Sequence, residues 1–269
     1  AELERASKAG GKSGDVSGAR WSLFQSFRAG MATLPEAVAA RLGAIIRKSA
    51  DVIAMSRVGE RWRLALASDD HLDADAVICA APAFAASKML SSTAPQPSAS
   101  MGAIGYASAA TVNLTFRETD FARPPAAFGF VAPAIEHRKI IAGSFSSYKF
   151  EGRAPAGNIL VRAFVGGVLQ AAMMDLADDE IVAAVREEFR LLLGVSAEPG
   201  LAIVRRWPAS MPQYEVGHLA RVAEIERAVA AIPRFAIAGA AWHGVGIPDC
   251  IRSGEQAAAE IFAELSAES

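Results

Sequence analysis

An apolar run, a glycine-rich loop and a long helix-forming segment follow one another near the C-terminal end of the chain. Residues 235–238 are continuously apolar, as in strands that are buried on both faces. Gly239 and the sequence Gly-Val-Gly-Ile-Pro-Asp at 244–249 follow, and residues 249–265 have the composition of a helix. This order predicts a strand, loop and helix unit of an α/β protein.

The loop in this unit is a candidate ligand site. The first N–H groups of a helix have no partner within the helix, and they carry the positive end of its dipole. Gly244 and Gly246 have no Cβ that could block a flat ligand, and Pro248 lies where its missing N–H costs little. Such a loop suits an anion, including a reduced flavin. The alternative is an ordinary glycine-rich turn, which spacing alone favours slightly because the chain has no Gly-x-Gly-x-x-Gly.

Composition excludes several classes of protein. The 269 residues are 52% hydrophobic and 21% charged, with a net charge of −2, which excludes collagenous, disordered and disulfide-stapled chains and argues against nucleic acid as a partner. Cys79 and Cys250 lie far apart in apolar stretches, which predicts buried thiols in a reducing, cytoplasmic compartment and no metal site. The longest uncharged stretch, 89–116, is too interrupted by polar residues and proline for a membrane span.

The N-terminal third predicts a helix followed by short strands. Thr33 and Glu36 match a capping box with Pro35 in the first turn, and one helical face carries Leu34, Val38, Leu42 and Ile45. We expect strands at 52–55 and 62–66 joined by a turn at 58–61, and a buried strand at 77–80. Residues 91–100, rich in Ser and Pro, predict a linker or crossover.

The region after residue 100 predicts a largely antiparallel sheet with flanking helices. Short apolar segments separated by Gly, Pro and charged residues lie at 111–116, 128–131, 140–145, 159–165 and 201–207. An amphipathic helix is expected at 178–193, with Gly194 as its stop, and another at 218–232.

Three further features carry weaker functional hypotheses. Residues 6–13 miss a phosphate-binding Walker loop by one glycine and lack a preceding strand, so a flexible linker is the better interpretation. No Ser, Cys, Asp or Glu can be assigned to His243 as a catalytic partner from sequence spacing, which favours a packing or backbone-bonding role. Arginines suited to carboxylates recur in the second region, although most are expected on a solvated face: Arg117, Arg123, Arg138, Arg153, Arg162, Arg205 and Arg206.

Several segments together resemble a known family of flavoenzymes. They are SLFQSFRAGMATLPEAVAARL (22–42), DADAVICAAPA (73–83), KFEGRAPAGNILVRAFVGG (149–167), RRWPASMPQYEVGH (205–218) and AGAAWHGVGIPDCIRSGEQAA (238–258). The chain is similar to the oxygen-dependent protoporphyrinogen/coproporphyrinogen III oxidase family, within the flavin amine-oxidase superfamily. The resemblance covers nearly all of the chain from residue 20 onward.

The resemblance implies an α/β (α+β) fold that corresponds to the C-terminal portion of the family. Residues 20–95 and 235–269 would belong to an incomplete, Rossmann-like FAD-binding domain, and 96–234 to a substrate-binding domain. Residues 1–19 would be a linker or the tail of a helical, membrane-facing domain. The first part of the FAD domain and that helical domain would precede Ala1.

The resemblance also implies site residues. The backbone of Val52 would contact the adenine end of FAD, and Trp207 would lie near the flavin. The pyrimidine edge of the flavin would meet Gly244, Val245, Gly246 and Ile247. Leu114 and Phe130 are the apolar candidates for substrate contact, and no residue receives a catalytic or metal-binding role.

The implied function is FAD-dependent oxidation of a porphyrinogen to the porphyrin in heme biosynthesis, with dioxygen as acceptor. The alternatives are a flavin amine oxidase of the same superfamily, and a non-enzymatic binding module or inactive fragment without the dinucleotide-binding segment. We expect no tight FAD on the isolated chain, and dimerisation or aggregation through exposed sheet edges and apolar surface. Peripheral contact with a membrane would come through the absent helical domain.

Overall fold

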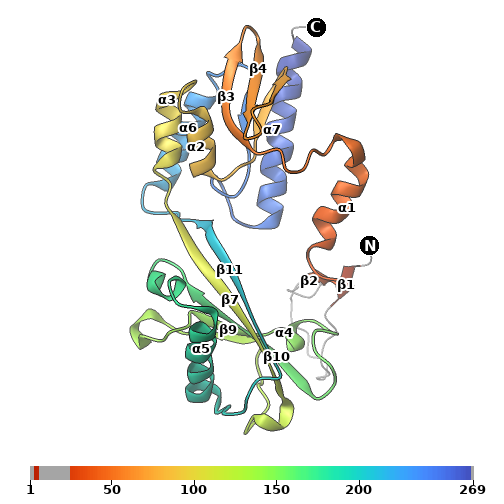
Figure 1. Cartoon of the computed structure of the whole chain (residues 1–269), viewed down its shortest axis with the longest axis vertical. Coiled ribbons are helices and arrows are strands. Elements are labelled where there is room, and N and C mark those ends of the chain that lie inside the picture. Colours follow the sequence, from red (N-terminus) through yellow and green to blue (C-terminus); the bar gives the residue numbers. More distant parts are fainter. Residues whose placement is uncertain (1–2, 6–24, 268–269) are drawn as a thin grey trace, which may run out of the picture. The chain divides into compact units, whose positions relative to one another are not determined.

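The computed structural model describes residues 3–5 and 25–267, and it forms two compact units (Figure 1). The first unit comprises Ala1–Ile46 and Ser108–Pro208, and the second Arg47–Ala107 and Ala209–Ser269. The boundaries predicted from the resemblance fall after residues 19, 95 and 234 instead, but both divisions make the unit with the C-terminal helix discontinuous. The Walker-like sequence at 6–13 lies outside the described residues.

The second unit begins with a three-stranded antiparallel sheet. It consists of β3 (Val52–Val58), β4 (Arg61–Leu66) and β5 (His71–Ala74), in that order. Gly59 opens the tight turn between β3 and β4 with a φ of +62°, which glycine adopts without strain. The register shifts between Val52 and Ala54, so Ile53 is the extra residue of a bulge. The predicted strands at 52–55 and 62–66 are confirmed.

A second, parallel strand pair in this unit carries the C-terminal helix. β6 (Val77–Cys79) pairs with β12 (Phe235–Ile237), and α7 spans Ile247–Ala267. Ala236 and Ala238 pack with Ala257 and Ile261 of the helix in a small apolar cluster. The predicted strand, loop and helix unit is therefore confirmed.

Three helices, α2 (Ala83–Leu90), α3 (Pro95–Gly102) and α6 (His218–Val229), complete the second unit. The linker prediction for 91–100 is wrong, because most of that segment belongs to α3. Pro95 lies in the first turn, where proline is tolerated. The Ser98 hydroxyl donates to the Ser87 carbonyl at 2.6 Å, and Met101 is fully buried. The core also contains fully buried Trp62, Leu90 and Ile225.

A five-stranded sheet in the order β11, β7, β10, β9, β8 lies mostly in the first unit. These strands are β7 (Tyr106–Arg117), β8 (Gly129–Val131), β9 (Ala142–Phe145), β10 (Asn158–Gly166) and β11 (Leu201–Pro212). The pairs β7–β10, β10–β9 and β9–β8 are antiparallel, as predicted. The fold is thus the expected mixed α/β type.

Helix α5 (Asp178–Leu193) packs on one face of this sheet. Its buried Ile181, Val185 and Phe189 share a core with apolar side chains of the sheet, including Val112 and Val161. Gly194 ends the helix in the left-handed region, and its N–H donates to the Arg190 carbonyl at 3.2 Å. Both the helix and its stop are confirmed.

Helix α1 (Thr33–Leu42) forms as predicted, but its capping box does not. Ala32 already has helical angles and occupies the N-cap, so Thr33 lies inside the first turn and makes no cap bond. Val38, Leu42 and Ile45 of the predicted apolar face are exposed.

The remaining elements are short. They are β1 (Leu3–Arg5), β2 (Gln25–Phe27), α4 (Ser146–Lys149), η1 (Gly43–Ile45), η2 (Glu118–Asp120), η3 (Ala134–Glu136) and η4 (Ala171–Met174). Within residues 3–5 and 25–267, each helix is too short or too polar to cross a lipid bilayer.

Candidate functional site

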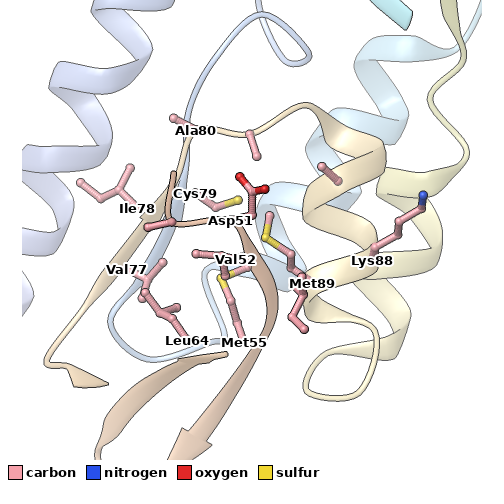
Figure 2. Close-up of a pocket in the computed structure, with 14 residues that line it drawn as sticks. Asp51, Val52, Met55, Leu64, Val77, Ile78, Cys79, Ala80, Lys88 and Met89 are labelled. Atoms are coloured by element: carbon pink, nitrogen blue, oxygen red, sulfur yellow. The ribbon is translucent and has the colours of Figure 1, made fainter. Parts of the chain in front are cut away.

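A pocket of about 710 Å³ opens in the second unit where β3, β6 and α2 meet (Figure 2). Its lining is mostly apolar and includes Val52, Met55, Leu64, Val77, Cys79 and Met89. Two lining residues are charged, Asp51 and Lys88, and both are exposed. The pocket therefore offers an apolar interior with charged groups at its opening, which suits a flat ring system with a polar edge.

Secondary structure fixes the position of each wall. Asp51 immediately precedes β3, and its carbonyl accepts a hydrogen bond from the Ala67 N–H at 2.9 Å. Val52 pairs with Leu66 just before the bulge at Ile53. Val52 is therefore held at the pocket edge where the strand departs from regular pairing.

Cys79 supplies a thiol to the opposite wall. It is 6% exposed, and burial raises the pKa of its thiol above the ordinary value. A raised pKa keeps the sulfur protonated and weakly nucleophilic near neutral pH. The thiol thus contributes apolar surface to the pocket rather than reactivity.

The glycine-rich loop before α7 is arranged around an acidic side chain. A Cβ on Gly244 would lie 2.6 Å from Oδ2 of Asp249, and one on Gly246 would lie 2.8 Å from the same oxygen. Asp249 also accepts a hydrogen bond from Arg252 at 3.0 Å. At both positions a Cβ would meet Asp249, so the glycines leave space for that side chain. That they also make room for a ligand stays a prediction. A carboxylate in the first turn also compensates part of the helix dipole.

The predicted cofactor residues fall in different places. Val52 lines the pocket, whereas residues 244–247 are not among its lining, although they belong to the same unit. Val245 and Ile247 are exposed, which leaves this loop accessible. Trp207 lies on β11 of the first unit and is 53% exposed. The roles assigned to these residues stay predictions.

The two predicted substrate residues face the core of the first unit. Leu114 is fully buried beneath α5, and Phe130 is half-buried, with its ring centroid 6.2 Å from that of Phe145. Leu114 has no accessible surface, whereas Phe130 keeps part of its surface exposed, and the substrate role of both residues stays a prediction.

Two rows of side chains lie on the opposite face of the same sheet. Cross-strand pairing joins Asn113 to Arg162, Arg162 to Ser144 and Ser144 to Gly129. The neighbouring row consists of Thr111, Phe164, Ala142 and Val131, paired in the same way. Every residue in these rows is exposed or half-buried. A polar row thus runs beside a partly apolar row on an accessible surface.

Arg162 was one of seven candidate arginines, and the structure distinguishes it from several others. Arg206 binds Asp178 and the carbonyls of Met174 and Leu176. Arg153 donates to the Phe27 carbonyl at 2.7 Å, and Arg138 lies 3.8 Å from buried Glu188. These three hold the fold together, whereas Arg162 lies on the accessible face.

His243 has a partner that sequence spacing did not reveal. Its Nε2 lies 2.5 Å from Oε1 of Glu226, and both side chains are largely exposed. The predicted packing or backbone-bonding role is therefore wrong. Glu226 lies on α6, and only the tertiary fold brings it to the segment before α7. His218 is the buried histidine, with Nε2 3.1 Å from the Trp242 carbonyl and its ring stacked on Tyr214.

Comparison with known proteins identifies the class. The sequence profile of the flavin containing amine oxidoreductases matches residues 3–262, and the chain belongs to this family. It is 35% identical over 245 residues to a coproporphyrinogen III oxidase of Bacillus subtilis, which covers 90% of this chain and 52% of that protein. It is 32% identical over 256 residues to the protoporphyrinogen oxidase of Bos taurus, and this match covers 90% of this chain and 52% of that protein.

Solved structures agree on the fold. A candidate protoporphyrinogen oxidase from Exiguobacterium sp. 255-15 has a TM-score of 0.78 and 28% identity, with 90% of this chain and 52% of that one covered. A putrescine oxidase variant has a TM-score of 0.71 at 17% identity, over 90% of this chain and 55% of that one, and so shows likeness of fold alone. The chain spans about half the length of the curated relatives it matches.

Proposed function

We propose that this chain forms part of an FAD-dependent oxidase that converts a porphyrinogen to the porphyrin with dioxygen as acceptor, in heme biosynthesis. The observation that carries the proposal is the match to coproporphyrinogen III and protoporphyrinogen oxidases over 90% of the chain. Coproporphyrinogen III and protoporphyrinogen IX are the candidate substrates.

The pocket at Val52 supports FAD as the flavin. FMN has no adenine, whereas the adenine ring of FAD could bury its faces against apolar residues such as Val52, Leu64 and Met89. Asp51 and Lys88 stand at the opening, where the polar edge and ribose would meet charged groups. The residues present therefore fit the adenine end of FAD.

The loop at residues 244–247 is proposed to meet the pyrimidine edge of the flavin through its backbone N–H groups. Val245 and Ile247 are exposed, and the first N–H groups of α7 have no partner within the helix. Trp207, exposed on β11, is the proposed aromatic neighbour of the flavin.

The accessible sheet face is proposed to form a wall of the substrate site. Phe164 and Val131 expose apolar surface in one row, which suits the edge of a macrocycle. When bound, FAD supplies the hydride acceptor that the methylene bridge of a porphyrinogen requires. The task of this chain is then to orient the macrocycle and exclude water, which needs no nucleophile or metal ligand.

Two alternatives are separated by activity. An amine oxidase of the same superfamily would oxidise amines and leave porphyrinogens unchanged. An inactive fragment or binding module would oxidise neither.

The test is to replace the matching segment of the Bacillus subtilis enzyme with this chain and to assay the purified protein in air. Porphyrin fluorescence formed from coproporphyrinogen III or protoporphyrinogen IX supports the proposal. Hydrogen peroxide released only with a panel of amines contradicts it. The Bacillus subtilis enzyme is the positive control.

A further inference from the structure

The five-stranded sheet of the first unit has a strong bias toward positive charge. Its strands contain Arg117, Arg162, Arg205 and Arg206 but no Asp or Glu. Arg206 is neutralised by Asp178 from α5. The sheet therefore presents positive charge without a compensating carboxylate of its own, which favours an anionic ligand.

Arg162 is the best placed of these arginines. It lies on β10, with β7 on one side and β9 on the other, and its side chain is exposed. Its Nε donates to Oδ1 of Asn113 at 2.8 Å. Among the described residues, this is the hydrogen bond that its guanidinium makes, and no ion pair involves it. Nη1 and Nη2 are therefore available for a carboxylate, and Asn113 orients the group that would bind it.

The surroundings of Arg162 suit a ligand that has both an apolar ring system and an acidic group. Phe164 follows two residues later on the same face, and Val131 lies in the same row as Phe164. Apolar surface thus lies beside an oriented guanidinium.

We propose that Arg162 binds a propionate of the porphyrinogen, with Phe164 and Val131 against the macrocycle and Asn113 as a positioning residue. This inference rests on the proposed function and narrows its substrate. Coproporphyrinogen III carries a propionate on every pyrrole ring and presents one in any orientation, whereas protoporphyrinogen IX carries propionates on half of its rings. Arg162 therefore favours coproporphyrinogen III.

The experiment titrates the 269-residue chain with coproporphyrin III, protoporphyrin IX and coproporphyrin III tetramethyl ester, following quenching of tryptophan fluorescence. We expect Arg162→Gln to weaken binding of coproporphyrin III by about tenfold or more, since a hydrogen bond to a charged group is lost. Arg162→Lys should lose less affinity for coproporphyrin III than Arg162→Gln, because the charge remains but the bidentate geometry does not. The affinity of Asn113→Ala for coproporphyrin III should lie between those of Arg162→Lys and the wild type. The uncharged ester should bind all variants with equal affinity.

Arg123→Gln is the matched control, since it removes the same charge from an exposed loop position of the same unit. It should leave all three affinities unchanged. Equal affinity of wild type and Arg162→Gln for coproporphyrin III would overturn the role of Arg162 and leave the proposed function standing. Failure of the wild-type chain to bind any of the three porphyrins, the ester included, would count against the proposed function itself and remove this inference with it.

Discussion

The indole N–H of Trp62 donates a hydrogen bond of 3.2 Å to the carbonyl of Pro233, 171 residues later in the chain. Trp62 is fully buried, and its ring packs against Phe235 with centroids 5.2 Å apart. Arg57 donates to the same carbonyl at 3.3 Å. This relationship joins the sheet that carries Val52 to the strand that leads into α7.

Replacing Trp62 by Phe should lower the free energy of unfolding by about 2 kcal/mol, through the lost hydrogen bond and reduced packing. The loss stays moderate because Arg57 still donates to the Pro233 carbonyl. Urea unfolding followed by circular dichroism measures it. Adding Arg57→Ala should cost more in the Trp62→Phe background than in the wild type, and strict additivity would show that the two donors act independently.

ADP should protect Cys79 from alkylation, because this thiol lines the pocket proposed for the adenine end of FAD. At ADP ten times above its dissociation constant, the modification rate should fall roughly tenfold. FMN, which lacks adenine, should not protect. Cys250, half-buried and outside the pocket lining, is the internal control for mass spectrometry. Equal rates at Cys79 with and without ADP would argue against the pocket assignment.

The pH dependence of Cys79 follows from the direction of its pKa shift. Burial raises the pKa of this thiol, so alkylation should accelerate at a higher pH than for an exposed thiol. Between the ordinary and the raised pKa, the unfolded chain releases a proton that the folded chain keeps. The free energy of unfolding should therefore fall as pH rises through this window, and Cys79→Ser should flatten that part of the profile.

Gly244→Ala should destabilise the protein by about 1–3 kcal/mol, because its Cβ would collide with Asp249. The same substitution should cost less in an Asp249→Gly background. Gly254 is the matched control, since a Cβ there meets no atom within 4 Å and the position lies inside α7. Gly254→Ala should stabilise by about 0.5–1 kcal/mol. Thermal unfolding compares the four variants, and equal effects of the two alanines would refute this account of the loop.

Glu188→Ala should lower the free energy of unfolding by about 3 kcal/mol, because it leaves Arg138 without its buried partner. It also removes the acceptor of the Lys139 N–H, which donates to Oε1 at 2.9 Å. Glu188→Gln keeps an acceptor and should lose less. The neighbouring Glu187→Ala breaks only an exposed pair with Arg190, and its urea midpoint should hardly move. Matching midpoints for Glu188→Ala and Glu187→Ala would disprove the argument.

Elements defined by local pattern were predictable, and those defined by tertiary packing were not. Helix α5 follows from the spacing of Ile181, Val185 and Phe189, and its end follows from Gly194. Helix α3 does not follow from the local pattern, because its Ser and Pro residues indicate a loop. Burial of Met101 and the hydrogen bond from Ser98 to α2 stabilise the helix instead.

The same limit applies to the candidate site. Val52 could be named from the resemblance, but the face on which a strand residue lies depends on register with its neighbours. Leu114 and Arg162 illustrate this, since one lies beneath α5 and the other on the accessible face. The pair of His243 with Glu226 likewise needs α6 to be in place.

The discontinuous second unit has a kinetic consequence. Its two halves, Arg47–Ala107 and Ala209–Ser269, are separated by roughly a hundred residues, and closing a flexible loop of that length costs about 4 kcal/mol in entropy. The neighbouring strands β7 and β11 bring the two ends of the intervening segment together. If that segment folds first, most of the entropy of loop closure is already lost before the core of the second unit assembles. Mutations in the β7–β11 pairing should therefore slow refolding of Trp62 into its buried environment, even though that residue lies outside both strands.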